Sequence, residues 1–130
     1  MPSFGERSTL NLKTCHVGLQ TLAHAVIPHI DFSVTEGHRN REDQERAFHA
    51  GLSKLHWPFG KHNKFPSEAI HFIPYPIDWN DKERFYFLAG YVLCEAERLD
   101  LRIRWGGDWD RDMDLRDQSF YDLGHYEILL

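Results

Sequence analysis

Apolar residues recur along this chain with two different periods, and the periods predict where helices and strands lie. Over residues 10–27 they recur at steps of three and four, the period of a helix with one buried face, and Pro28 ends the segment. Over residues 31–37 the side chains alternate in character, which is the period of a strand, and a glycine ends it. Residues 1–8 are polar, and we expect them to form a loose arm.

Two further helices are predicted in the rest of the chain. Residues 40–50 form a charged segment, with the asparagine at its start as the N-cap and Gly51 as its end. Residues 81–99, which Asn80 is expected to cap, have apolar positions at helical spacing and predict the central packing helix.

Three shorter segments predict strands. Residues 68–73 alternate between two faces, residues 103–105 form an apolar strand, and the final segment, FYDLGHYEILL, leads out of a turn into the last strand. A long loop over residues 52–65 precedes the first of them. Together the elements predict one small α+β domain over residues 1–130, with an antiparallel sheet packed against helices and no repeat or linker.

Composition and charge limit the kinds of partner that this chain is expected to have. The chain has 130 residues, of which 42% are hydrophobic, as in one globular domain. Its formal net charge is -5 without a dense run of Lys or Arg, so no nucleic acid partner is expected. No apolar run reaches the roughly 20 residues of a membrane span, and no apolar signal core is present, so we expect no membrane insertion. Cys15 and Cys94 lie in predicted helices and are expected to be buried thiols without a disulfide.

Histidines are the main candidates for chemistry, since nine occur in this short chain. His71 lies within the predicted strand and His62 lies in the loop before it, so both could reach one metal ion. His125, in the final segment, is the candidate third ligand. The alternative is that His71 is a hydrogen-bonded core residue and His62 a surface residue.

Asp122 and Arg39 could supply what amide hydrolysis needs beside a metal. Asp122 precedes His125 by three residues, so its carboxylate could reach a water at an open zinc position without being a ligand. Such a carboxylate takes a proton from the water and passes it to the leaving amine. Arg39, at the junction of a predicted strand and helix, could offset the charge of the oxyanion, or it could be structural.

The loop over residues 106–119 is rich in aspartate, whose carboxylates could bind calcium. It lacks the EF-hand spacing, with a glycine at the sixth position and a glutamate at the twelfth. We therefore do not expect a calcium site there and place the metal hypothesis on the histidines.

Six blocks of sequence carry a resemblance to a known family. In chain order they are EGHRNREDQ, SKL, KHNKFPSEAIHFIPYPIDW, RFYFLAGYVL, RWGGDWD and DQSFYDLGHYEI, and they span about residues 30–128. In these blocks the chain resembles the phage L-alanyl-D-glutamate endopeptidases, which belong with the VanY-like D-alanyl-D-alanine carboxypeptidases and the hedgehog-like zinc folds. The resemblance implies a hedgehog-like α+β fold and a zinc peptidase.

The motifs of this family imply roles for individual residues. Its zinc ligands are a His in an S-x-H block, an Asp in an A-x-D block and a final His. A carboxylate three residues before that His is the base, and an arginine ahead of a Gln-containing helix stabilises the oxyanion. Carried over by position, the implied zinc ligands are His62, His71 and His125, the base is Asp122, the oxyanion residue is Arg39, and the substrate-binding residues are Gln44 and Ser67.

Two positions depart from the family's pattern. His71 stands where the family has aspartate, and Gly60 stands where it has serine. Imidazole is a good zinc ligand, but the exchange removes a negative charge and brings in a longer side chain. Loss of the serine removes a hydrogen bond of a kind that typically matters by about 10–100-fold.

The resemblance implies a zinc-dependent peptidase that cuts the stem peptides of bacterial peptidoglycan, in the first instance between L-Ala and D-Glu. The departures leave two alternatives open. One is a phage virion, tail or wall-binding protein of the same fold with impaired catalysis, and the other is a D-Ala-D-Ala carboxypeptidase. We expect a monomer that stays in the host cytoplasm until holin-type release, or one that is carried in a virion.

Overall fold

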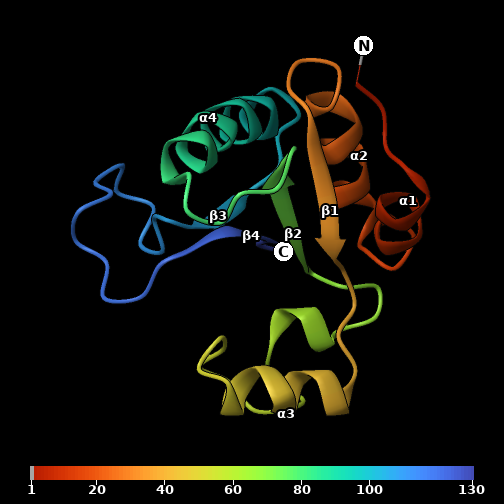
Figure 1. Cartoon of the computed structure of the whole chain (residues 1–130), viewed down its shortest axis with the longest axis vertical. Coiled ribbons are helices and arrows are strands. Elements are labelled where there is room, and N and C mark those ends of the chain that lie inside the picture. Colours follow the sequence, from red (N-terminus) through yellow and green to blue (C-terminus); the bar gives the residue numbers. More distant parts are fainter. Residues whose placement is uncertain (1) are drawn as a thin grey trace.

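Within residues 2–130, which the computed structural model describes, a four-stranded antiparallel sheet is combined with four α-helices (Figure 1). The strands lie in the order β1-β2-β4-β3. They are β1 Phe32–Glu36, β2 Ala69–Pro74, β3 Ile103–Gly106 and β4 Asp122–Ile128. The helices are α1 Glu6–Leu12, α2 Val17–Val26, α3 Arg41–His49 and α4 Lys82–Arg98, and η1, a short 3-10 helix, spans Lys61–Asn63. The predicted α+β fold with an antiparallel sheet is confirmed.

Helices α2 and α4 pack against each other and against the sheet, and the apolar core lies between them and the strands (Figure 1). Its fully buried members include Leu19, Leu22, Val26, Phe32, Phe72, Leu88, Val92 and Tyr126. Helix α1 lies beside β1, whereas α3 lies apart from α2 and α4, near the end of β1 and the start of β2 (Figure 1). The region between α3 and the sheet is therefore separate from the core.

The strands turn their polar side chains to the face opposite the core. In β2, Ile70 and Phe72 belong to the core cluster, so His71 between them points the other way. In β4, Tyr126 belongs to the core, and the preceding residue, His125, points away from it. The alternation predicted for the segment around His71 is confirmed.

A β-bulge in β1 brings Glu36 to this polar face. Val34 pairs with Phe72, but the next paired residue is Glu36, which lies opposite His71. The extra residue reverses the alternation of the strand. Without the bulge, Glu36 would share the core face with Val34.

The helix predicted over residues 10–27 is in fact two helices, so the prediction is wrong at residues 13–16. There the backbone pairs with the loop before β2 instead of continuing the helix. The N–H of Ser67 donates to the carbonyl of Thr14 at 2.8 Å, and the N–H of His16 donates to the carbonyl of Ser67 at 2.8 Å. This pairing ties the α1–α2 connection to the loop that carries η1.

The segment expected to be a loose arm, residues 1–8, is helical from Glu6, where α1 begins. Ser8 is buried, and its hydroxyl accepts a hydrogen bond from the N–H of Val34 at 2.9 Å. The arm prediction is therefore wrong for residues 6–8, because α1 is held against β1.

The other predicted helices are confirmed, with one change at a terminus. Asn40 caps α3 by accepting from the N–H of Asp43 at 2.9 Å, and Gly51 follows that helix with a φ of 76°. Asn80 does not cap α4. The N-cap position is taken by Asp81, whose side chain makes no capping hydrogen bond.

Of the two cysteines, only Cys15 is buried, in the break between α1 and α2. Burial raises the pKa of its thiol to about 11. Cys94 is exposed on α4, so the prediction that it is buried is wrong. Both are free thiols. None of the helices in residues 2–130 combines the length and apolar character that a bilayer span requires.

Alanine at Gly106 should destabilise the fold by about 1–3 kcal/mol. A Cβ at this position would lie 2.0 Å from the carbonyl oxygen of Asp122 on the neighbouring strand. Gly90→Ala is the matched control, because a Cβ there meets no atom within 4 Å and alanine favours the α4 helix by about 0.5–1 kcal/mol. Urea denaturation of both variants measures the difference. Equal stability of the two variants would contradict the close contact between β3 and β4.

Candidate metal centre

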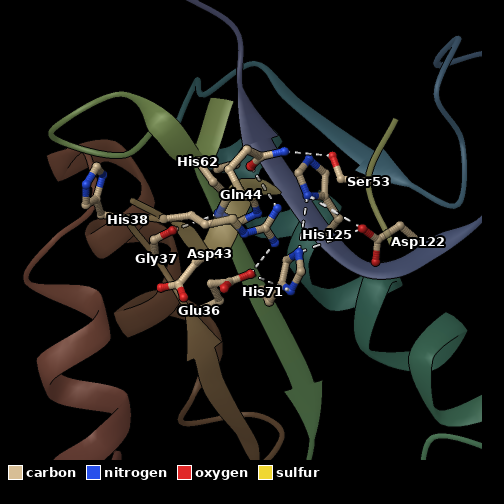
Figure 2. Close-up of polar contacts among 12 residues, drawn as sticks. Glu36, Gly37, His38, Asp43, Gln44, Ser53, His62, His71, Asp122 and His125 are labelled. Carbon is tan, nitrogen blue, oxygen red and sulfur yellow. Dashed lines mark hydrogen bonds and ion pairs between the residues drawn. The ribbon is translucent and has the colours of Figure 1, made fainter. Parts of the chain in front are cut away.

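Three histidine rings from three separate elements meet on the polar face of the sheet. His62 lies in η1, His71 in β2 and His125 in β4, and the last two are direct cross-strand partners. Their ring centroids are 4.7, 5.1 and 5.5 Å apart, and one ring nitrogen from each lies within 4.8 Å of the others. Figure 2 shows His71, His125 and Asp122 facing one another. The three histidines singled out in the sequence thus form one cluster.

One ring nitrogen of His62 is hydrogen-bonded, and the other has no hydrogen-bond partner within the described residues. Its Nδ1 lies 2.7 Å from the carbonyl oxygen of Gly37, which can only accept, so Nδ1 carries the proton. Its Nε2 is buried and has no hydrogen-bond partner within the described residues. His62 is only 4% exposed, so the surface alternative for this residue is wrong. This buried lone pair without a donor is available to bind a ligand.

Each of the other two rings also has a carboxylate near its outward nitrogen, at hydrogen-bond distance only for His125. Nε2 of His125 lies 2.8 Å from a carboxylate oxygen of Glu127, and its Nδ1 lies 3.4 Å from Nε2 of His71. Nδ1 of His71 lies 3.8 Å from the carboxylate of Glu36. In each of the three histidines an oxygen acceptor therefore lies near the nitrogen that points out of the cluster.

Two histidines of the cluster, His62 and His71, are held in their neutral form. Burial lowers the pKa of His62 well below its usual value, and repulsion from the neighbouring rings adds to this. Burial also lowers the pKa of His71 to about 4, although Asp122 opposes the shift. Neutral imidazole is the form that binds metals, so the donor set fits a divalent transition metal such as zinc.

Asp122 lies beside the cluster without a hydrogen bond to it. One of its oxygens is 3.8 Å from Nε2 of His71 and 3.9 Å from Nδ1 of His125. Its side chain is 29% exposed, so water can reach it. The carboxylate therefore faces the same point as the free nitrogens of the rings.

Arg39 and Gln44 lie on the wall of the same cavity, whose volume is about 570 Å³. Arg39 is buried, forms an ion pair with Glu36 and donates to the side-chain oxygen of Gln44 at 3.1 Å. The amide nitrogen of Gln44 donates in turn to the carbonyl of Leu55 at 2.7 Å. The apolar part of the wall is formed by Leu52, Leu55, Phe59, Trp109 and Phe120.

Ser67 is not part of this cavity. It is fully buried, and its hydroxyl donates to the carbonyl of Ala69 at 2.7 Å and accepts from the N–H of the same residue at 3.2 Å. The structure therefore brings together every predicted site residue except Ser67, which shapes the loop before β2.

Gly60, where the family pattern has serine, is closely packed. A Cβ there would lie 2.9 Å from the side-chain oxygen of Asn63 and 3.2 Å from that of Gln44. Its N–H donates to the same oxygen of Asn63 at 2.9 Å. The loop before His62 is thus built around a glycine at this position.

Glu36 and Glu127 were missed by reasoning from the sequence. Glu127 is two residues from His125, so the period of a strand assigns both to the same face and could have found it. Glu127 is buried, which by itself raises its pKa, but the hydrogen bond from His125 and the ion pair with Arg104 bring the pKa below its usual value. Glu36 depends on the bulge in β1, which no simple period predicts.

The aspartate-rich loop forms a second acidic group. Asp108, Asp110, Asp112 and Asp117 can place one oxygen each within 4.8 Å of the others. Asp108 is buried and accepts from the backbone N–H of Met113 at 2.9 Å, so it also organises the loop. The expectation that this loop holds no calcium stays a prediction.

Comparison with known proteins agrees with this geometry. A family model described as phage L-alanyl-D-glutamate peptidase matches residues 2–129. The L-alanyl-D-glutamate peptidase of Escherichia phage T5 is 31% identical over 135 residues, which cover 97% of each chain. The crystal structure of the L-Ala D-Glu endopeptidase ChiX from Serratia marcescens superposes with a TM-score of 0.77 at 22% identity, over 98% of this chain and 91% of that one.

These matches extend over almost the whole chain. The likeness to ChiX confirms the expected fold, and the family match confirms the resemblance found in the six sequence blocks. The chain therefore belongs to the phage L-alanyl-D-glutamate peptidase family.

Proposed function

We propose that this chain cuts the stem peptides of bacterial peptidoglycan with a zinc ion held by His62, His71 and His125. The family's reaction is hydrolysis of the amide bond between L-Ala and D-Glu. The observation that carries the proposal is the meeting of three imidazoles beside one carboxylate, on the wall of a cavity. Three protein ligands leave zinc a fourth position for water or substrate.

Zinc, when bound, supplies a Lewis acid that polarises the amide carbonyl and lowers the pKa of water. The protein supplies the proton transfers. Asp122 faces the free nitrogens of His71 and His125, so it is placed to accept a proton from the attacking water. The same carboxyl then passes that proton to the leaving amine of D-Glu.

Arg39 is the candidate for stabilising negative charge on the carbonyl oxygen. It lines the cavity, and contacts with Glu36 and Gln44 hold its guanidinium in place. A cation fixed in advance and shielded from water stabilises a developing oxyanion without reorganisation. Gln44 is a positioning residue in this scheme, because its oxygen accepts from Arg39.

The cavity wall is suited to an anionic peptide. Lys54 and Lys61 line it, and the ammonium of Lys54 lies 5.1 Å from the ring centre of Phe120. Stem peptides carry free carboxylates, which lysines attract. Trp109 and Phe59 offer apolar surface for the methyl and methylene groups of the peptide.

Replacing His71 with alanine should lower zinc affinity by more than about 100-fold, since a ligand matters more than the outer contacts that are worth 10–100-fold. Metal analysis of wild type and variant, after chelation and zinc refill, measures this. His49→Ala, on the exposed end of α3, is the control and should keep one zinc per chain. Wild-type protein that binds no zinc after refill would contradict the proposed centre.

Asp122→Asn should lower turnover by about 100-fold or more, because the amide cannot accept the proton. Release of new amino termini from purified peptidoglycan measures turnover, and zinc content should not change. Asp114→Asn, at a half-exposed carboxylate of the 106–119 loop, is the control. Zinc binding by wild type without any turnover would instead favour the wall-binding alternative.

The metal-free protein should lose stability as the pH falls from about 6.5 to about 4. The folded pKa of His71 is about 4, below its usual 6.5, so in this window the unfolded chain takes up a proton that the folded chain does not. For His71 alone the loss is on the order of 3 kcal/mol across the window. Urea titrations of wild type and His71→Asn at pH 7 and 4.5 test this. An equal loss in both proteins would contradict the neutral form of His71 in the folded protein.

A further inference from the structure

We propose that Glu127 is a positioning residue for the metal centre. Its carboxylate fixes His125 in the tautomer whose Nδ1 lone pair points at the other two histidines. The inference rests on the proposed function and adds to it a residue that is not a ligand.

The contact between Glu127 and His125 is set by the backbone. The two residues lie two apart on β4 and therefore on the same face of the sheet. One carboxylate oxygen of Glu127 is 2.8 Å from Nε2 of His125. Both side chains are buried, at 5% exposure for Glu127 and 9% for His125, so water does not compete for this hydrogen bond.

Arg104 holds the other oxygen of the same carboxylate. Its guanidinium donates to Glu127 at 2.6 Å, and the two residues are cross-strand partners of β3 and β4. A buried carboxylate without a cation would be costly, so Arg104 stabilises Glu127 in the charged form. The guanidinium also lies 5.8 Å from the ring centre of Trp109, which in turn lies 5.3 Å from the ring of His125. Arg104 thus contacts both Glu127 and Trp109, the two side chains that lie against His125.

The hydrogen bond decides which nitrogen of His125 can bind a metal. A carboxylate only accepts, so Nε2 of neutral His125 must carry the proton. The lone pair is then on Nδ1, which lies 3.4 Å from Nε2 of His71. Without Glu127 the ring could take the other tautomer, with the proton on Nδ1. The N–H would then face the cluster, and a protonated nitrogen cannot bind a metal.

His62 shows the same arrangement with the nitrogens exchanged. The carbonyl of Gly37 holds its Nδ1, which leaves Nε2 free. The acceptor for His62 is a backbone carbonyl, whereas the acceptor for His125 is the side chain of Glu127. Glu127 can therefore be tested by substitution, and Gly37 cannot.

The test begins with wild-type protein without metal. Long-range 1H–15N spectra at pH 8 should show His125 protonated at Nε2 and unprotonated at Nδ1. A purely structural role for Glu127 does not require this tautomer. An Nδ1-protonated His125 would overturn the proposal, whatever the variants do.

Zinc affinity, measured by competition with a chromophoric chelator, is the second readout. Glu127→Gln should weaken affinity by about 10–100-fold, the usual effect of removing such a contact. Glu68→Gln is the control, since Glu68 pairs with Lys61 at 3.9 Å and contacts none of the three histidines. Unchanged affinity in a folded Glu127→Gln protein would overturn the proposal. If that variant does not fold, the wild-type tautomer decides the question.

The two readouts separate this inference from the proposed function. Wild-type protein that binds no zinc contradicts the metal centre itself. Tight zinc binding by wild type, with equal affinity in Glu127→Gln, contradicts only the role of Glu127.

Discussion

The antiparallel pairing of β2 with β4 is the interaction on which the site depends. It sets His71 directly opposite His125, while the adjacent pair, Ile70 and Tyr126, meets in the apolar core. Burial of one face therefore fixes two of the imidazoles on the other, because a slip of one residue would exchange the faces. Only His62 comes from outside the sheet, and its ring is tied to the chain just after β1 through the carbonyl of Gly37.

His62 and His71 are neutral, so the carboxylates around the rings contribute much of the electrostatics of the centre. Asp122, Glu36 and Glu127 each have an oxygen within 4 Å of a histidine nitrogen, at 3.8, 3.8 and 2.8 Å. A divalent cation among the rings would meet this negative charge just beyond its ligands. The three carboxylates thus set the negative potential around the rings.

Much of this arrangement could be predicted from local periods in the sequence. The alternation around His71 and the three-residue step from Asp122 to His125 are local features, and both are consistent with the structure. The break at residues 13–16 could not be predicted, because it depends on backbone pairing with a loop far along the chain. Glu36 was missed for a related reason, since the period of β1 assigns it to the core face.

The bulge in β1 makes the pairing register of that strand a requirement of the site, in addition to its residues. If β1 kept its length but paired with β2 in uniform register, Thr35 would lie opposite His71, and the carboxylate of Glu36 would turn into the apolar layer under α2 and α4. Arg39 would lose its ion-pair partner in the same step. A change of register that alters no residue of the cavity wall would thus change both the partner of a buried charge and the surroundings of His71, so the register of β1 matters to the site as much as the residues of the cavity do.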